Sequence, residues 1–242
     1  MMTTHRDTGT RIDEIAEDIY RINTPVALPD GTAFSFNQYL LVDEEPLIFH
    51  TGLRGLFPQV SAAVARVMPP ARLRHVAFSH VEADECGALN LWLAAAPQAA
   101  PLCSAVAAMV SMNDLADRPP RALADGERLS LGRHTVRWFE TPHLPHGWES
   151  GLPMDETTGT LFCGDLFTQP GKGDPALTED DILGPSEAFR AQMDYYAHAP
   201  GTDALLEALA QAAPTTLACM HGSGWHGDGG MLLRTLAGSL RH

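Results

Sequence analysis

The alternation of apolar and polar residues divides the chain into short strands and amphipathic helices. In the first fifty residues the apolar runs are brief and are separated by turn signals such as Asp30-Gly31, which is typical of an antiparallel meander. Further on, apolar runs alternate with segments whose apolar residues recur every three or four positions. The predicted strands cover 19–22, 34–42, 47–50, 74–78, 101–103, 126–131, 134–140, 161–164 and 215–220; the predicted helices cover 56–67, 88–96, 104–115, 185–198, 202–212 and a closing segment that contains Leu232, Leu236 and Leu240.

The order of these elements predicts the fold. Consecutive strands come first, strand and helix then alternate, and a hairpin around Gly132-Arg133 leads into a second series of strands and helices. Two such halves usually pack with their sheets face to face and their helices outside. We therefore expect an α+β fold, an αββα sandwich, that forms a single domain over residues 1–242.

Composition narrows the classes of function. The chain has 242 residues, of which 45% are hydrophobic, so it can bury a full core. Its formal charge of −14 argues against nucleic acid or an anionic membrane as a partner. The first 21 residues have several acidic side chains and no apolar core, and no run approaches the roughly 18 apolar residues that span a bilayer. We therefore expect a soluble, cytoplasmic protein.

The cysteines add no site of their own. Cys86, Cys103, Cys163 and Cys219 are widely spaced and form no C-x-x-C pair. This spacing argues against both a disulfide framework and a thiolate zinc site. We expect four reduced thiols, most of them buried.

The most informative stretch is 76–89, where an apolar run ends in His80, Glu82, Asp84 and Glu85 before a helical pattern begins. An extended backbone directs every second side chain to the same side, so His80, Glu82 and Asp84 would face one way. Neighbouring carboxylates repel one another unless a cation lies between them. The pattern indicates a metal site at a strand end, and the alternative is a charged, solvated loop.

Three other predicted strands also end in candidate ligands. A loop with His143 and His146 follows one strand, Asp165 follows the next, and His221 follows the last. Each signal is weak alone, because a histidine after a strand more often bonds to the backbone. Loops from several strands gather at one edge of a sheet, so together they provide at least six ligands. Six is enough for two metal ions that share a bridging carboxylate.

These residues resemble the metallo-β-lactamase superfamily and, within it, the branch of flavodiiron proteins and the short oxygen-binding di-iron proteins. Hydrolases of the superfamily have H-x-H-x-D-H in the first loop, whereas this chain has His80-x-Glu82-x-Asp84-Glu85. Its second ligand is thus a carboxylate, as in the di-iron branch. His146, Asp165 and His221 follow in the family's order, and the resemblance spans essentially the whole chain.

The resemblance implies a centre of two iron ions, with manganese or zinc as the alternatives. His80, Glu82 and His146 would hold one ion, Asp84 and His221 the other, and Asp165 would bridge them. Exchanging an imidazole for a carboxylate makes a site harder and moves its preference from zinc toward iron or manganese. His146 matches the family's spacing to the following tryptophan better than His143, which is the other candidate in that loop.

Three departures from the family pattern remain open. Glu85 replaces a second histidine, and it is either an additional ligand or an acidic residue that stabilises the start of the next helix. His50 lies where the superfamily commonly has an aspartate, and it is either a partner behind the ligands or a packed strand-end histidine. The chain has no room for a flavodoxin-like domain after Asp165 and no G-x-G-x-x-G after a strand, so we expect no flavin in this chain.

The leading hypothesis is a non-haem di-iron protein that binds or reduces O2 or NO. Its electrons would come from a separate donor protein, and the resemblance implies a possible homodimer. One alternative is a dinuclear metal hydrolase of an ester, lactone or phosphodiester on the same fold. Another is an oxygen sensor that binds its ligand without turnover.

Overall fold

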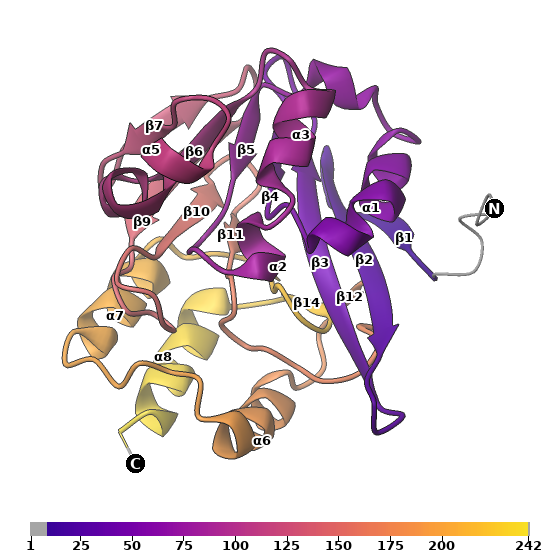
Figure 1. Ribbon diagram of the computed structural model, residues 1–242. Helices are drawn as coiled ribbons and strands as arrows, with labels where there is room; N and C mark the ends of the chain where they lie inside the picture. Colours follow the sequence, from indigo (N-terminus) through magenta and orange to yellow (C-terminus); the bar gives the residue numbers. More distant parts are fainter. Residues whose placement is uncertain (1–8, 242) are drawn as a thin grey trace.

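The computed structural model describes residues 9–241; Met1–Thr8 and His242, and with them the start of the acidic N-terminal segment, lie outside the described residues. Two seven-stranded sheets pack face to face, and helices cover the outer face of each (Figure 1). Among the described residues, no helix combines the length and the apolar character needed to cross a bilayer.

The first sheet has its strands in chain order, β1 to β7. The pairs from β1 to β4 are antiparallel and those from β4 to β7 are parallel, so the carboxyl ends of β4, β5 and β6 meet at one edge. The strands are β1 Arg11–Ala16, β2 Ile19–Ala27, β3 Ala33–Leu41, β4 Leu47–Phe49, β5 His75–Ala77, β6 Ala100–Ser104 and β7 Arg121–Leu123. The α-helices of this half are α1 Phe57–Val64, α2 Ala83–Cys86, α3 Leu89–Ala95, α4 Ala105–Ala107 and α5 Asn113–Leu115.

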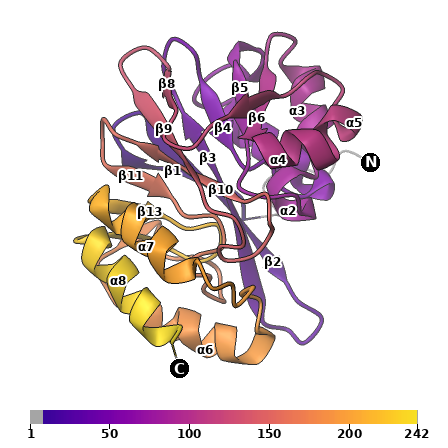
Figure 2. The same cartoon turned by 90° about the vertical axis from the view of Figure 1, so that its left-hand side faces the viewer.

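The second sheet has the order β12-β14-β13-β11-β10-β9-β8. Its strands are β8 Arg128–Ser130, β9 Thr135–Glu140, β10 Gly151–Asp155, β11 Thr160–Phe162, β12 Leu177–Thr178, β13 Thr216–Ala218 and β14 Gly224–His226. Helices α6 Leu183–Met193, α7 Thr202–Gln211 and α8 Gly229–Ser239 belong to this half (Figure 2). Because β11 and β13 are parallel, with Phe162 opposite Ala218, the segments that follow them leave the sheet at the same edge.

Three hydrophobic clusters separate the four layers. One packs α1 and α3 on the first sheet, one lies between the sheets, and one packs α7 and α8 on the second sheet. The middle cluster contains Tyr39, Phe49, Trp138 and Phe162, all almost completely buried. Full burial of such a side chain contributes about 1.5–3 kcal/mol. The predicted αββα sandwich is confirmed.

Several elements differ from the prediction. The strands β1, β7, β10, β12 and β14 were not predicted, since they are short or contain charged residues or proline. The predicted helix at 104–115 is interrupted by the π-helical turn Ala108–Met112. The helix predicted to reach residue 198 ends at Met193, after which Asp194 adopts a left-handed φ of 47°. All four cysteines are free, and all but Cys86 are buried, as predicted.

Buried donors of the first sheet hold the loop that follows β13. The Arg21 guanidinium donates to the Gly222 carbonyl at 2.7 Å, and the Asn37 amide donates to the Cys219 and Gly222 carbonyls at 2.8 and 2.9 Å. The Tyr39 hydroxyl also donates to Cys219. These bonds join residues about 180 to 200 positions apart, and they fix the loop of the second sheet against the first.

Candidate metal centre

The six predicted ligands lie together where loops from both sheets meet. His80 and Glu82 follow β5, Asp84 is in the first turn of α2, and the remaining three side chains come from the loops after β9, β11 and β13. Glu82 is extended, with φ −131° and ψ 169°, but the backbone becomes helical at Ala83. The prediction of an extended backbone through Asp84 was therefore wrong, although its carboxylate still faces His221.

His80, Glu82 and His146 form one group, which we call the histidine-rich side. The two imidazole Nε2 atoms are 2.9 Å apart, and Glu82 Oε1 is 3.2 Å from His146 Nε2 and 3.8 Å from His80 Nε2. Two ligand atoms bound at about 2.1 Å and at right angles to each other are about 3 Å apart. The group therefore has the spacing needed to hold one cation.

Asp84, Glu85 and His221 form a second group, the carboxylate-rich side, whose ligand atoms lie within 4.8 Å of one another. Asp165 stands between the two sides. Its Oδ2 is 3.6 Å from His80 Nε2 and 3.4 Å from His146 Nε2, whereas its Oδ1 is 3.2 Å from His221 Nε2. The two oxygens of one carboxylate thus face different histidines, which is the arrangement required of a bridging ligand.

Backbone carbonyls determine which nitrogen faces the centre in two of the histidines. His146 Nδ1 donates to the Tyr195 carbonyl at 2.9 Å, and His221 Nδ1 donates to the Ser35 carbonyl at 2.9 Å. Because a carbonyl only accepts, Nδ1 must carry the proton. In the neutral ring, the lone pair of Nε2 then points toward the carboxylates, as a metal ligand requires.

His80 is oriented by a longer chain of buried groups. Its Nδ1 is 2.9 Å from Ser79 Oγ, which is 3.0 Å from His50 Nε2, and His50 Nδ1 is 2.9 Å from Met220 Sδ. A thioether has no proton, so His50 Nδ1 donates to it and His50 Nε2 accepts from the Ser79 hydroxyl. Ser79 then accepts from His80 Nδ1, which leaves His80 Nε2 with its lone pair toward the centre. The structure places His50 behind the candidate ligand.

The pKa values of the centre are shifted because several buried carboxylates and histidines lie close together. Burial raises the pKa of Glu85 well above its usual value, and the neighbouring Asp165 and Asp84 raise it further. Burial also disfavours the charged forms of Asp165 and His221, but their mutual contact outweighs it, so the pKa of Asp165 falls and that of His221 rises. The pKa of His146 rises in spite of its burial, because of Glu82 and Asp165. The neighbouring carboxylates therefore favour the protonated forms of His146 and His221 when no cation lies between them.

The donor set fits a pair of hard cations. Asp165 Oδ1 and both carboxylate oxygens of Glu85 are buried and have no hydrogen-bond partner among the described residues. A buried polar group without a partner costs about 1–3 kcal/mol. With His221 in its neutral form, its Nε2 and Asp165 Oδ1 face each other as two electron-pair donors, a contact that a cation between them would make favourable. Carboxylate oxygens and imidazoles together suit iron or manganese.

The other candidate residues are placed differently. His143 is exposed and belongs to none of the three groups that could hold a metal ion. Glu85 is fully buried within the carboxylate-rich side. Sequence reasoning missed Ser79, although it directly precedes His80, and it could not have found the carbonyls of Tyr195 and Ser35, since a carbonyl leaves no mark in the sequence.

Aromatic rings cover the centre on one side. The centroids of Phe34 and Phe36 are 4.5 and 5.4 Å from that of His221, and Phe189 of α6 stacks on Phe34 at 5.7 Å. Tyr195 lies 6.1 Å from His146. These rings replace water with apolar surface beside two of the candidate ligands.

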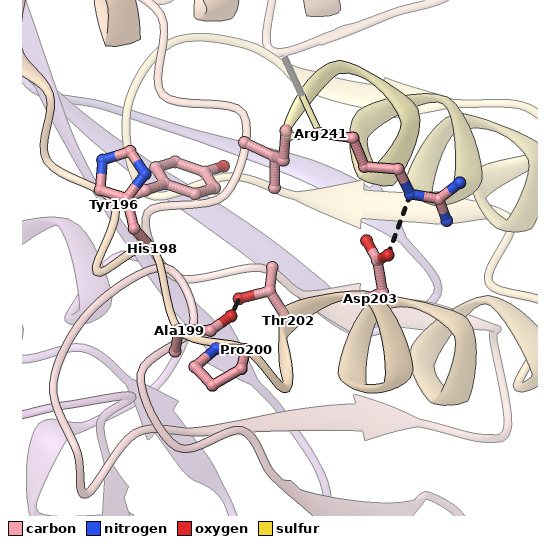
Figure 3. Close-up of a pocket in the computed structure, with 8 residues that line it drawn as sticks. Tyr196, His198, Ala199, Pro200, Thr202, Asp203 and Arg241 are labelled. Carbon is pink, nitrogen blue, oxygen red and sulfur yellow. Dashed lines mark hydrogen bonds and ion pairs between the residues drawn. The ribbon is translucent and has the colours of Figure 1, made fainter.

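Two cavities differ in their relation to the centre. A hollow of about 360 Å³ has Glu82 in its wall and is otherwise lined mainly by apolar residues of α2, α3 and the helical segment 105–115. A second cavity, of about 220 Å³, lies between α7 and the end of α8, where Asp203 and Arg241 form an ion pair (Figure 3). None of the candidate ligands lines this second cavity, so it is separate from the centre.

Comparison with known proteins identifies the family. Residues 34–222 match the model of the ODP family beta lactamases. The chain belongs to this family. This ODP-family chain is 29% identical over 203 residues to rubredoxin-oxygen oxidoreductase from Megalodesulfovibrio gigas, a match that covers 80% of the chain and 49% of the relative. It is 24% identical over 224 residues to nitric oxide reductase from Moorella thermoacetica, covering 86% and 55%.

The fold of the ODP-family chain matches a solved flavodiiron protein. Its TM-score with the metal-soaked Flv1 flavodiiron core from Synechocystis sp. is 0.77 at 22% identity, covering 96% of this chain and 61% of that one. The predicted resemblance to the metallo-β-lactamase superfamily and its flavodiiron branch is thus confirmed. It spans about half the length of the curated relatives it matches.

Proposed function

We propose that this chain is a non-haem di-iron protein that reduces O2 or NO with electrons from a separate donor protein. The observation that carries the proposal is the position of Asp165, whose two oxygens face histidines of different groups in a centre rich in carboxylates. The names of the two relatives, an oxygen oxidoreductase and a nitric oxide reductase, support this class of reaction.

The proposed ligands follow from the two sides of the centre. His80, Glu82 and His146 would hold one ion, Asp84 and His221 would hold the other, and Asp165 would bridge them. Two adjacent ferrous ions would supply electrons to a diatomic molecule and polarise it. The replacement of an imidazole by Glu82 supports iron, or manganese, over zinc.

The protein would contribute orientation and exclusion of water. Carbonyls and Ser79 keep the three Nε2 atoms directed at the centre, so little reorganisation is needed when a metal binds. Phe34, Phe36 and Phe189 provide an apolar wall, which favours a small apolar substrate over water. The hollow that has Glu82 in its wall would be the route by which the substrate reaches the centre.

The test begins with protein purified without air. We expect about two irons per chain and consumption of O2 or NO when a reductant and a rubredoxin-type electron carrier are supplied. Two zincs per chain with ester hydrolysis that is lost in Asp84→Ala would instead support a hydrolase. Oxygen that binds but is not consumed under the same conditions would support a sensor.

A further inference from the structure

Glu85 is the buried group that the proposed ligand set leaves unused. Its side chain has 0% exposure, and neither carboxylate oxygen has a hydrogen-bond partner among the described residues. A buried carboxylate is expensive unless it is paired or coordinates a metal. The ionised Glu85 carboxylate therefore needs compensation from a cation or a hydrogen-bond donor.

Stabilisation of the helix does not supply that compensation. Glu85 is in the first turn of α2, which has only four residues, and no backbone N–H of that turn donates to its carboxylate. Its main chain is fixed instead, because the Glu85 carbonyl accepts from the Thr51 N–H at 2.7 Å just beyond β4. The backbone of Glu85 is thus held in place, while its carboxylate makes no hydrogen bond among the described residues and is available as a metal ligand.

The position of the carboxylate relates it to both sides of the centre. A Glu85 oxygen lies within 4.8 Å of ligand atoms of His80 and Asp165. A Glu85 oxygen also lies within 4.8 Å of ligand atoms of Asp84 and His221. Asp165 is the other carboxylate that faces histidines of both sides. On the proposed di-metal function, we propose that the Glu85 carboxylate is a second bridge between the two ions, beside Asp165.

The charge of the centre agrees with this role. Glu82, Asp84 and Asp165 carry three negative charges between them, and Glu85 adds a fourth that balances two divalent cations. The same extra charge stabilises the ions more as they become oxidised, so it lowers the reduction potential of the centre. A centre built this way is neutral in its reduced form.

The direct test is a crystal structure of the wild-type chain loaded with Mn²⁺ alone, with anomalous scattering to locate the ions. We expect one Glu85 oxygen at about 2.2 Å from each of two Mn²⁺ ions. Glu85 with both oxygens on one ion, or with neither oxygen near an ion, would overturn the proposal. This test requires no variant to fold.

Substitution gives a second, independent readout. Loss of a residue that hydrogen-bonds to a metal ligand lowers metal affinity by roughly 10- to 100-fold. Because Glu85 would be a ligand itself, we expect Glu85→Gln to weaken binding of the second Mn²⁺ by at least that factor. We also expect Mn²⁺ to raise the Tm of the variant less than it raises the Tm of wild type, because one proposed ligand is gone. A purely structural role would shift the Tm of the metal-free and the Mn²⁺-loaded protein equally. Glu179→Gln, on an exposed loop, is the matched control and should change neither.

The two proposals can fail separately. If Glu85 bridges two Mn²⁺ ions but the iron-loaded chain consumes neither O2 nor NO, the bridge stands and the proposed reaction is wrong. If the iron-loaded chain is active but Glu85 contacts at most one ion, the reaction stands and the bridge is wrong.

Discussion

The two sides of the centre use different chemistry. The histidine-rich side has two imidazoles and one carboxylate, and its Glu82 side chain is 51% exposed. The carboxylate-rich side has one imidazole and two carboxylates, of which Asp84 is 19% exposed and Glu85 is fully buried. Nitrogen-rich sites accept zinc readily, whereas oxygen-rich sites favour harder ions. If the proposed centre holds two ions, the carboxylate-rich side would favour a hard ion more strongly than the histidine-rich side.

The two sides also arise from different parts of the chain. The loop after β5 supplies one imidazole and every carboxylate except Asp165 within the six residues 80–85. The second sheet supplies single residues from three loops, and two of these are histidines oriented by carbonyls of distant segments. The loop after β5 thus supplies most of the negative charge, and the second sheet supplies Asp165 and the two histidines held by carbonyls.

Asp165→Asn should have the largest effect, because Asp165 serves both sides. We expect fewer than one iron per chain and a loss of reductase activity on the order of 100-fold or more. Metal analysis and O2 consumption measure these quantities. Asp203→Asn removes an exposed carboxylate at the cavity of Figure 3 and should leave both unchanged. An Asp165→Asn protein that retains two irons would contradict the bridging role.

His146→Ala should impair the histidine-rich side alone. We expect about one tightly bound iron per chain, held on the carboxylate-rich side, and activity reduced by about 100-fold. His143→Ala in the same loop is the matched control, since His143 is exposed and outside the centre, and its activity should stay within about twofold. Equal losses in both variants would mean that the loop, rather than the His146 ring, matters.

Ser79→Ala should have a smaller effect, because it disturbs a ligand only through its support. The variant leaves His80 Nδ1 and His50 Nε2 without the hydroxyl between them. We expect iron affinity to fall about 10- to 100-fold and the free energy of unfolding to fall by about 1–3 kcal/mol. Competition with a chelator and urea denaturation measure the two changes. Unchanged affinity would mean that the His50 chain does not orient His80.

The pH dependence should be the mildest effect and should be shared by both sides. His146 and His221 have raised pKa values in the metal-free centre, so each holds its proton to a higher pH than an ordinary histidine. Those protons stabilise the metal-free fold at low pH, and their contribution is lost as the pH rises through the raised pKa values. A metal must displace them, so Mn²⁺ affinity should fall about tenfold between pH 7.5 and 6.5. Calorimetry in buffers of different ionisation enthalpy would detect the released protons, and affinity that is independent of pH would contradict this account.

Much of the fold was predictable because its strongest patterns are local. The meander, the hairpin at Gly132-Arg133 and the apolar spacing of α7 and α8 predicted the sandwich. The missed strands show the limit of such patterns. In β1, polar Asp13 and Glu14 are tolerated at a sheet edge, and in β10 Pro153 is buried between neighbours, so tertiary packing overrides both propensities.

Which side chains lie together was predictable but their arrangement was not, and metal binding by these residues stays a prediction. The spacing His80, Glu82, Asp84 and the strand-end positions of His146, Asp165 and His221 identified the residues that now lie together. The sequence left Glu85 undecided, because a ligand and a helix-stabilising residue at that position look identical until burial and unmet hydrogen bonds are known.

The hydrogen bonds from Arg21, Asn37 and Tyr39 to the loop that contains His221 have a consequence for the order of folding during synthesis. The donors lie in β2 and β3, whereas the acceptor carbonyls belong to residues 219–222. During synthesis these hydrogen bonds therefore cannot form until nearly all of the second sheet has been made, and the acidic loop at 80–85 is made long before His221. His221 therefore reaches its position beside the loop at 80–85 only after residues 219–222 have been made.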